Sequence, residues 1–306
     1  MSIIMNTVKS ARNVYDVLKN QMDNSDIEIL FFHGQMPIVP KEKMAKKIVK
    51  LFGKDRTYRP KKAIVVSTQI LEQSIDVDFD YMMTAICPID LLFQRLGREC
   101  RHFDNGTVRE GKKWYLECVV LYDTEDCSAV YPYLQSAILL QRTLKILQDK
   151  HQLNVPSDIR PCIDKVYEEN EELRSYIYAN QQDANAADAH TIDGPNLYGE
   201  IKLYENRGKL SRYHMVTRKS DMIRYNIAFL HQKDMNLCTD KVPVKDYIRI
   251  KTENVVSVPY YTVKKMNLEI DSLPHIFGDI ALYNVDSGDW KLDENYCLVE
   301  KEKMCI

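Results

Sequence analysis

Three arginines recur at every third position about a third of the way along the chain: Arg95, Arg98 and Arg101. Gly97 stands among them and allows tight packing beside them. Arginine binds phosphate in a planar, bidentate manner and stays charged under all relevant conditions. An arginine presented from one domain can reach a phosphoryl group bound on another and neutralise charge that develops during its transfer. The alternative for this segment alone is a helix terminus with solvated arginines.

Short polar segments follow three predicted strands. They are Asn6-Thr7, His33-Gly34 and Ser67-Thr68-Gln69. Parallel α/β sheets place functional residues on the loops at the carboxyl ends of their strands. Hydroxyls, amides and backbone N–H groups at such ends can hold phosphates without reading bases. A protein that translocates along a nucleic-acid strand needs this kind of sequence-independent contact.

The elements that must position these residues alternate between strand and helix. The strands are predicted at Ser2–Asn6, Ile27–Phe32, Ala63–Ser67, Tyr81–Ile86 and Tyr115–Tyr122, and the helices at Val8–Asn20, Lys41–Phe52 and Ile89–Leu96. Continuous apolar strands that alternate with helices indicate a parallel sheet covered on both faces. This part of the chain is therefore predicted to be an α/β domain.

The remainder of the chain has a different pattern. Helices are predicted over Ala129–Lys150 and within Pro156–Tyr178, and the polar segment Gln181–Pro195 is predicted to be a linker. Beyond it, strands are predicted at Met222–Phe229, Tyr247–Ile250, Val255–Val258, Ile280–Tyr283 and Tyr296–Val299, with a helix at Tyr260–Met266. We therefore expect an α/β domain over 1–125, a helical connector and linker over 126–195, and a small α+β domain over 196–306.

Composition excludes some classes of protein. No apolar run approaches the roughly 18–20 residues that a membrane span needs, and the N-terminal segment has no secretory signal. We therefore expect a cytoplasmic protein with no membrane partner. The cysteines form no Cys-x-x-Cys pair and the histidines no His-x-x-x-His pattern, and Asp76, Asp78 and Asp80 offer fewer oxygen ligands than cation sites use. No metal site is proposed.

The net charge of −2 conceals an uneven distribution. Residues 1–113 carry 19 basic and 14 acidic side chains, and ten of the basic ones lie within 41–62. A basic stripe is a possible footprint for a phosphate backbone. The alternative is a solvated helix face followed by a solvated loop, and charge alone favours that alternative.

Taken in order and spacing, the segments NTV, HG, STQILEQSIDVDFD and QRLGRECRH resemble the second motor domain of superfamily 2 helicases. The fuller string STQILEQSIDVDFDYMMTAICPIDLLFQRLGRECRH resembles one family in particular, the CRISPR-associated helicase–nuclease that degrades DNA in type I interference systems. The resemblance is strong over about residues 1–125. It implies a RecA-like parallel sheet flanked by helices, then a helical connector and a small α+β C-terminal domain.

The resemblance also implies roles for individual residues. Gln94, Arg98 and Arg101 would face ATP bound on a partner domain, with the two arginines as fingers on the γ-phosphate. Nucleotide contact or coupling is implied for Asp76, Arg95 and Gly97. Contact with the backbone of single-stranded DNA is implied for Asn6, Thr7, His33, Gly34, Thr68 and Gln69.

The sequence lacks the loop G-x-x-x-x-G-K-[ST] with which a first RecA-like domain holds the phosphates of ATP. It also lacks the acidic segment that would hold Mg²⁺ and the His-Asp pair of the family's nuclease domain. We therefore expect ATP to be shared with a first RecA-like and nuclease half, which would also hold Mg²⁺, and little turnover by this chain alone. That half is either encoded separately or belongs to a longer gene of which this chain is a truncated reading. A CRISPR surveillance complex is a further implied partner. The alternatives are a non-catalytic nucleic-acid-binding or assembly module, and part of a superfamily 2 helicase that acts on RNA.

Overall fold

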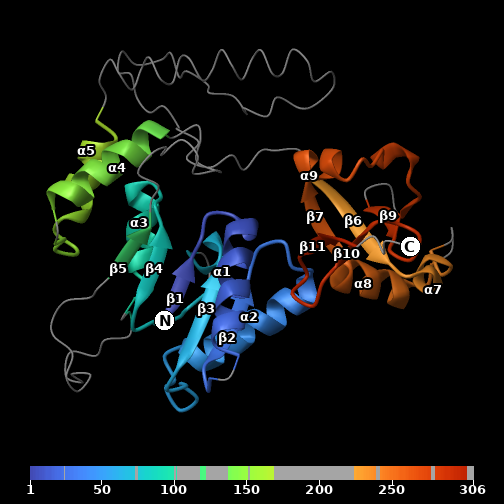
Figure 1. The fold of residues 1–306 in the computed structure, drawn as a ribbon, viewed down its shortest axis with the longest axis horizontal. Coiled ribbons are helices and arrows are strands. Elements are labelled where there is room, and N and C mark those ends of the chain that lie inside the picture. The colour runs from blue at the N-terminus through green and yellow to red at the C-terminus, as the bar shows by residue number, and fades with distance from the viewer. Residues whose placement is uncertain are drawn as a thin grey trace.

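The computed structural model (Figure 1) describes residues 1–23, 25–72, 75–99, 101, 118–121, 137–150, 152–168, 224–238, 242–276 and 280–301. We call the described residues up to 168 the N-terminal module and those from 224 onward the C-terminal module. The domain boundaries expected near 125 and 195, and the expected linker Gln181–Pro195, lie outside the described residues.

The N-terminal module contains a sheet whose described strands are all parallel, in the order β2-β3-β1-β4-β5. The central strand β1 (Ser2–Ile4) pairs with β3 (Ala63–Ser67) on one side and β4 (Met82–Ala85) on the other. The outer strands are β2 (Glu28–Phe32) and β5 (Cys118–Leu121). Since the strands run in one direction, the loops that follow them meet at one edge of the sheet. The predicted parallel α/β sheet is confirmed.

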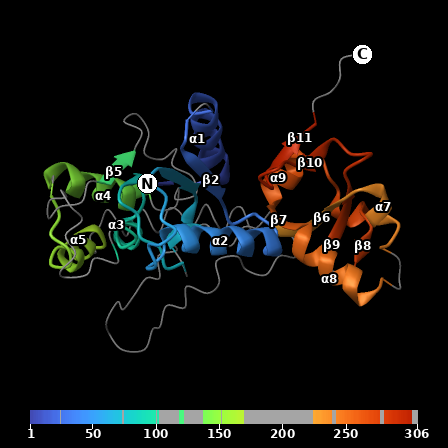
Figure 2. The ribbon, with the colours of Figure 1, turned by 90° about the horizontal axis from the view of Figure 1, so that it is seen from below.

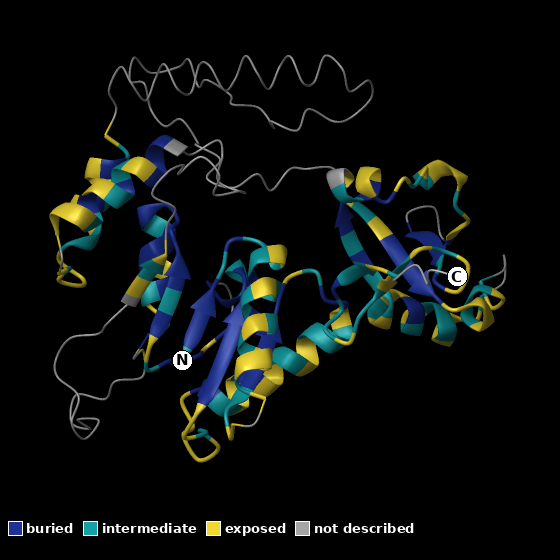
Figure 3. Ribbon diagram, in the orientation of Figure 1, coloured by how far each residue is buried: buried dark blue, intermediate teal, exposed yellow. Residues whose placement is uncertain are grey.

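Helices α1 (Val8–Gln21) and α2 (Ile38–Phe52) cover opposite faces of this sheet. The reason is the alternation of side chains along a strand. Phe31 of β2 stacks on Tyr15 of α1 with ring centroids 5.1 Å apart, whereas its neighbour Phe32 packs on the face that α2 covers. Figure 3 shows the strands buried between exposed outer helix faces.

α2 begins at Ile38, three residues before the predicted start at Lys41. The predicted helix began after Pro40, whereas this proline lies in the first turn of α2. Proline is tolerated in the first turn of a helix, where the backbone N–H has no partner within the helix. The other strands and helices predicted before residue 97 are present, with ends that differ by one or two residues.

A further layer packs beside β4 and β5. It consists of α3 (Ile89–Leu96), α4 (Ala137–Asp149) and α5 (Ile159–Val166), whose apolar side chains share one buried cluster. The Tyr167 hydroxyl donates a hydrogen bond of 2.7 Å to the Asp90 carboxylate at the start of α3. This layer holds the helix that carries the arginine motif against the sheet.

The C-terminal module is built on a mixed sheet in the order β7-β6-β9-β8. β6 (Arg224–Leu230) pairs antiparallel with β7 (Val255–Pro259) and parallel with β9 (Ile280–Asn284). Its other elements are β8 (His275–Ile276), the hairpin of β10 (Trp290–Leu292) and β11 (Leu298–Glu300), the helices α7 (Gln232–Met235), α8 (Val244–Glu253) and α9 (Tyr260–Lys265), and the 3₁₀ turn η4 (Ile270–Ser272).

The strand predicted at Tyr247–Ile250 is wrong, because these residues lie within α8. Tyr247 and Ile250 are three residues apart and pack into one apolar cluster, which is helical spacing. A window of four residues is too short to distinguish the two periods. α8 also contacts α2 of the N-terminal module, and Figure 2 shows the two helices meeting. Among the described helices, none is both long and apolar enough to cross a membrane.

Candidate functional site

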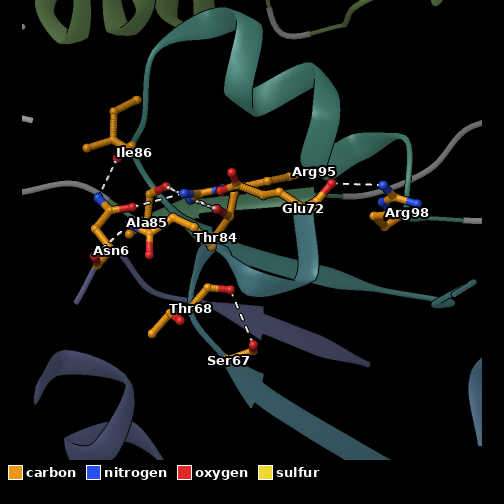
Figure 4. Close-up of polar contacts among 10 residues, drawn as sticks. Asn6, Ser67, Thr68, Glu72, Thr84, Ala85, Ile86, Arg95 and Arg98 are labelled. Carbon is orange, nitrogen blue, oxygen red and sulfur yellow. Dashed lines mark hydrogen bonds and ion pairs between the residues drawn. The ribbon is translucent and has the colours of Figure 1, made fainter. Parts of the chain in front are cut away.

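Arg95 lies at the centre of the edge where the strands end (Figure 4), and its side chain is completely buried. Its Nε donates to the Glu72 carboxylate at 2.7 Å, and Nη1 donates to the Thr84 hydroxyl at 2.6 Å and the Ala85 carbonyl at 2.9 Å. Nη2 donates to Asn6 Oδ1 at 3.1 Å. One guanidinium thus joins α3, β4, the loop after β1 and the 3₁₀ turn η1 (Gln69–Glu72).

This environment corrects the nucleotide contact predicted for Arg95. A buried guanidinium satisfied by protein oxygens cannot meet a ligand without breaking those bonds. The ion pair with Glu72 has both side chains completely inaccessible. Burial of two charges is tolerated only with such complete hydrogen bonding. Arg95 is therefore a positioning residue for the surrounding loops.

Asn6 is also engaged inside the protein. Its amide nitrogen donates to the Ile86 carbonyl at 2.8 Å, its amide oxygen accepts from Arg95, and its backbone carbonyl accepts from Gln69 Nε2 at 2.7 Å. The Asn6 side chain, predicted to contact a nucleic-acid backbone, is instead buried and ties β1 to β4. This is a second correction, and the amide group of Gln69 is likewise used to fix a loop.

Thr7 and Thr68 follow the central strands. Thr7 is the N-cap of α1, where its hydroxyl accepts from the Ser10 backbone N–H at 3.0 Å. Thr68 is 4% exposed at the end of β3, and its backbone N–H donates to the Phe32 carbonyl at 3.3 Å. The neighbouring Ser67 hydroxyl donates to the same carbonyl at 2.6 Å. Both predicted threonines thus lie where the sequence indicated, at adjacent strand ends.

Arg98 binds the end of η1 and residues 75–80, a segment with three aspartates that we call the acidic turn. Its Nη1 donates to the Ile75 carbonyl and its Nη2 to the Glu72 carbonyl, each at 2.8 Å. Its own carbonyl accepts from the Phe79 backbone N–H at 2.9 Å. The acidic turn and the arginine motif, separate in the sequence, are therefore interlocked, and Figure 4 shows Arg98 reaching toward Glu72.

Arg101 and Asp76 form the exposed part of the same junction. Arg101 Nε lies 3.2 Å from Asp76 Oδ1, and the two side chains are 41% and 58% exposed. Gln94 and Gly97 are also exposed, and a Cβ on Gly97 would make only ordinary contacts. The tight packing predicted for Gly97 is therefore not required. Among the described residues of this junction, the exposed side chains are those of Gln94, Arg101 and Asp76.

The neighbouring acidic residues are neutralised by arginines from the loop after α2. Arg56 lies 3.2 Å from the buried Asp78 carboxylate, and Arg59 lies 2.9 Å from Asp80. Among the described residues, no three histidine, cysteine or acidic side chains are grouped to hold a metal ion. Part of the basic segment 41–62 is therefore used to stabilise the acidic turn.

His33, predicted to contact a nucleic-acid strand, is completely buried at the end of β2. Its Nε2 lies 2.9 Å from the Asn295 carbonyl of the C-terminal module. Burial lowers the pKa of His33 to about 4. The adjacent Gly34 is exposed, with open space where a side chain would stand. The strand contact predicted for the His33 side chain is a third correction, and the sequence carried no signal that Asn295 would cover it.

Residues 1–104 match the family described as CRISPR-associated nuclease/helicase Cas3, C-terminal. The Cas3 nuclease/helicase of Streptococcus thermophilus is 33% identical over 172 residues, which cover 55% of this chain and 17% of that protein. The Cas3 endonuclease/helicase of Escherichia coli K12 is 31% identical over 171 residues, covering 55% and 19%. Over its first part the chain is therefore similar to the C-terminal region of Cas3 nuclease/helicases. It aligns with less than a fifth of these Cas3 relatives.

Solved Cas3 structures resemble nearly the whole chain in fold. Cas3 of T. fusca with ADP matches with a TM-score of 0.69 at 22% identity, over 97% of this chain and 38% of that one. A chain of a CRISPR RNA-guided surveillance complex in a pre-nicking state matches with a TM-score of 0.60 at 21% identity, over 97% and 38%. At such identities the likeness concerns the fold alone, and it agrees with the predicted RecA-like α/β fold.

Proposed function

We propose that this Cas3-like chain is the C-terminal half of an ATP-dependent motor that translocates on single-stranded DNA in CRISPR type I defence. Its part is to present an arginine to ATP held on a first RecA-like half and to contact the DNA backbone. The matches to nuclease/helicase relatives support the reaction class. The match to a surveillance-complex chain supports an assembly partner of that kind.

The observation that carries the proposal is the interlocked junction between the acidic turn and the arginine motif. Arg95 and Arg98 are used inside the protein, so they hold the junction in shape. Arg101 is left at its surface beside Asp76. When the γ-phosphoryl group passes to water, charge spreads over its equatorial oxygens, and a guanidinium fixed nearby stabilises that charge. Arg101 fits this finger role better than Arg98 does.

ATP and Mg²⁺ require groups that the described part of this chain does not offer. Its sequence has no phosphate-cradling loop, and Asp78 and Asp80 are paired with arginines. The residues present therefore fit one wall of a nucleotide site, and the phosphates and the cation would be held by the first RecA-like half. Motion of that half against this one would then move the DNA strand past the ends of β1 and β3.

The DNA contact is proposed for groups at those ends and at the end of β2. Since the side chains of Asn6 and His33 are occupied within the protein, the contact would rest on backbone groups near Thr68 and the open surface at Gly34. Contacts of this kind are independent of base sequence. They suit a motor that must act on any strand.

The test is ATP turnover by the full chain, alone and mixed with a separately produced nuclease and first RecA-like half of a Cas3 relative, with and without single-stranded DNA. We expect background turnover by the chain alone and DNA-stimulated turnover by the mixture. Arg101→Ala should lower the stimulated rate by roughly a thousandfold, the lower end of arginine-finger effects. The matched control is Arg160→Ala, which removes an arginine that is 91% exposed on α5 and should change nothing.

Three results would contradict this proposal. Undiminished turnover by Arg101→Ala in the mixture would exclude the finger role. Retained DNA binding with no turnover in any mixture would instead favour a non-catalytic binding or assembly module. A preference for single-stranded RNA over DNA in the same assay would assign the chain to RNA.

A further inference from the structure

A tight turn of the C-terminal module covers the end of β2. It comprises Asp293–Cys297, between β10 and β11, and it is separated from His33 by more than 250 residues. The Asn295 carbonyl accepts from His33, and Cys297 Sγ lies 3.7 Å from the same ring nitrogen. Since a carbonyl can only accept, His33 carries its proton on Nε2. Within the described residues, His33 Nδ1 has no hydrogen-bond partner.

The turn is shaped by one carboxylate. Asp293 Oδ1 accepts from the backbone N–H groups of Asn295 at 2.9 Å and Cys297 at 2.8 Å, which closes the turn on itself. The other oxygen of Asp293 pairs with Arg12 on α1. A single side chain thus both folds the turn and fastens it to the N-terminal module.

Apolar contacts complete the attachment on both faces of the sheet. Tyr296 packs with the cluster between the sheet and α2, whereas Cys297 is 4% exposed in the cluster between the sheet and α1. Tyr296 has a φ of 60°, in the left-handed region that side chains rarely adopt. Such a conformation persists when surrounding contacts hold it in place. Burial raises the pKa of the Cys297 thiol to about 12, so the thiol stays neutral.

We infer that Asp293–Cys297 is a latch that joins the C-terminal module to the RecA-like sheet, with His33 as its positioning residue. The latch and the contact between α2 and α8 together hold the two modules as one body. The latch itself does not depend on the proposed function. The mechanical consequence of the latch does depend on it. During translocation the C-terminal module would move with this half of the motor, and the His33 side chain would stay covered while the neighbouring Gly34 stays open to the DNA strand.

Hydrogen–deuterium exchange of the full chain, without nucleotide or DNA, tests the latch. Two variants separate the roles of Asp293. Asp293→Ala removes both the turn hydrogen bonds and the ion pair, whereas Asp293→Asn keeps an oxygen acceptor for the turn and loses only the charge. We expect exchange at the backbone amides of 295–297 to be accelerated about tenfold or more in the first and less in the second. Wild-type exchange in Asp293→Ala would overturn the inference.

Variants of His33 give a second test of the latch by the same exchange measurement. His33→Ala should accelerate exchange in the same turn, and His33→Gln, which retains an N–H donor, should restore most of the protection. His275→Ala is the matched control, because His275 is exposed on β8 and outside the latch. If His33→Ala does not fold, Arg12→Ala tests the same attachment from α1.

Binding to single-stranded DNA distinguishes the latch from a DNA contact at His33. A latch predicts that His33→Gln binds DNA with wild-type affinity. Weakened DNA binding by His33→Gln with unchanged exchange at 295–297 would assign His33 to the DNA and overturn the latch. Loss of motor activity in the mixing experiment would leave the exchange result standing, so the two proposals fail separately.

Discussion

Two buried polar sites lie at the same edge of the RecA-like sheet, and they differ in charge: one is an ion pair and the other a neutral histidine. At the ends of β1 and β4, the charged pair Arg95–Glu72 is surrounded by hydrogen bonds from residues of the helicase motifs. At the end of β2, a neutral His33 meets a backbone carbonyl of a distant turn. The first site organises loops within one module, and the second joins two modules. Polar residues that follow different strands of one sheet therefore have different structural roles.

The comparison also separates the arginines of a single motif. Arg95 is completely buried, Arg98 is half-buried on backbone carbonyls, and Arg101 is 41% exposed. The motif thus divides into two residues that hold the junction and one that remains accessible. Substitution of Arg95 or Arg98 should therefore mainly lower stability, whereas substitution of Arg101 should mainly lower activity.

The largest effect is expected at the buried ion pair. Glu72→Ala should lower the free energy of unfolding by about 3–5 kcal/mol, because it leaves the Arg95 charge buried without its partner. Urea unfolding followed by circular dichroism measures this change. Asp76→Ala, which breaks an exposed arginine pair of the same junction, is the control and should cost about 1 kcal/mol or less. Equal losses in the two variants would contradict the contrast between buried and exposed pairs.

The neutral site should respond to pH. His33 has a pKa of about 4 in the folded protein against an ordinary value of 6.5, so the unfolded chain takes up its proton first as pH falls. The stability that depends on neutral His33 is therefore fully present above pH 6.5, and it is lost as pH falls from 6.5 to 4, by about 3 kcal/mol in total. Comparing urea midpoints at pH 7 and 4.5 for wild type and His33→Gln isolates this term. A variant with the same pH dependence as wild type would refute it.

Arg98 should show an intermediate loss of stability. Arg98→Ala removes two charge-assisted hydrogen bonds to the Glu72 and Ile75 carbonyls, with an expected cost of about 1–3 kcal/mol. Arg98→Lys keeps the charge but cannot span both carbonyls, so it should recover only part of that loss. Thermal melting of both variants beside Arg101→Ala checks the prediction. A larger loss in Arg101→Ala than in Arg98→Ala would reverse the assigned roles.

The smallest effect is expected at the helix cap. Thr7→Ala removes the acceptor for the Ser10 backbone N–H and should cost about 1 kcal/mol. Thr7→Asp keeps an acceptor and should restore stability. DNA affinity, measured by fluorescence anisotropy on the same variants, then separates a cap from a contact. Unchanged stability in Thr7→Ala would show that the cap contributes little.

Much of the N-terminal module was predictable because its signals are local. Apolar strands and amphipathic helices in 1–96 were assigned correctly, since each buries one side of a short segment. The assignment at Tyr247–Ile250 was wrong because four residues do not define a period. A strand was predicted at Tyr115–Tyr122. The part that the structure describes, β5 at Cys118–Leu121, agrees with it. The linker Gln181–Pro195 stays a prediction.

The sequence by itself determined which residues gather at the carboxyl edge of the sheet, because parallel strands bring their following loops together. It did not determine which of those residues face solvent. α3 ends at Leu96, so the directions of Arg98 and Arg101 depend on the turn they bind. Whether His33 is buried or exposed depended on a turn more than 250 residues away. Only the tertiary structure decided these points, because burial depends on which distant segment covers a strand end.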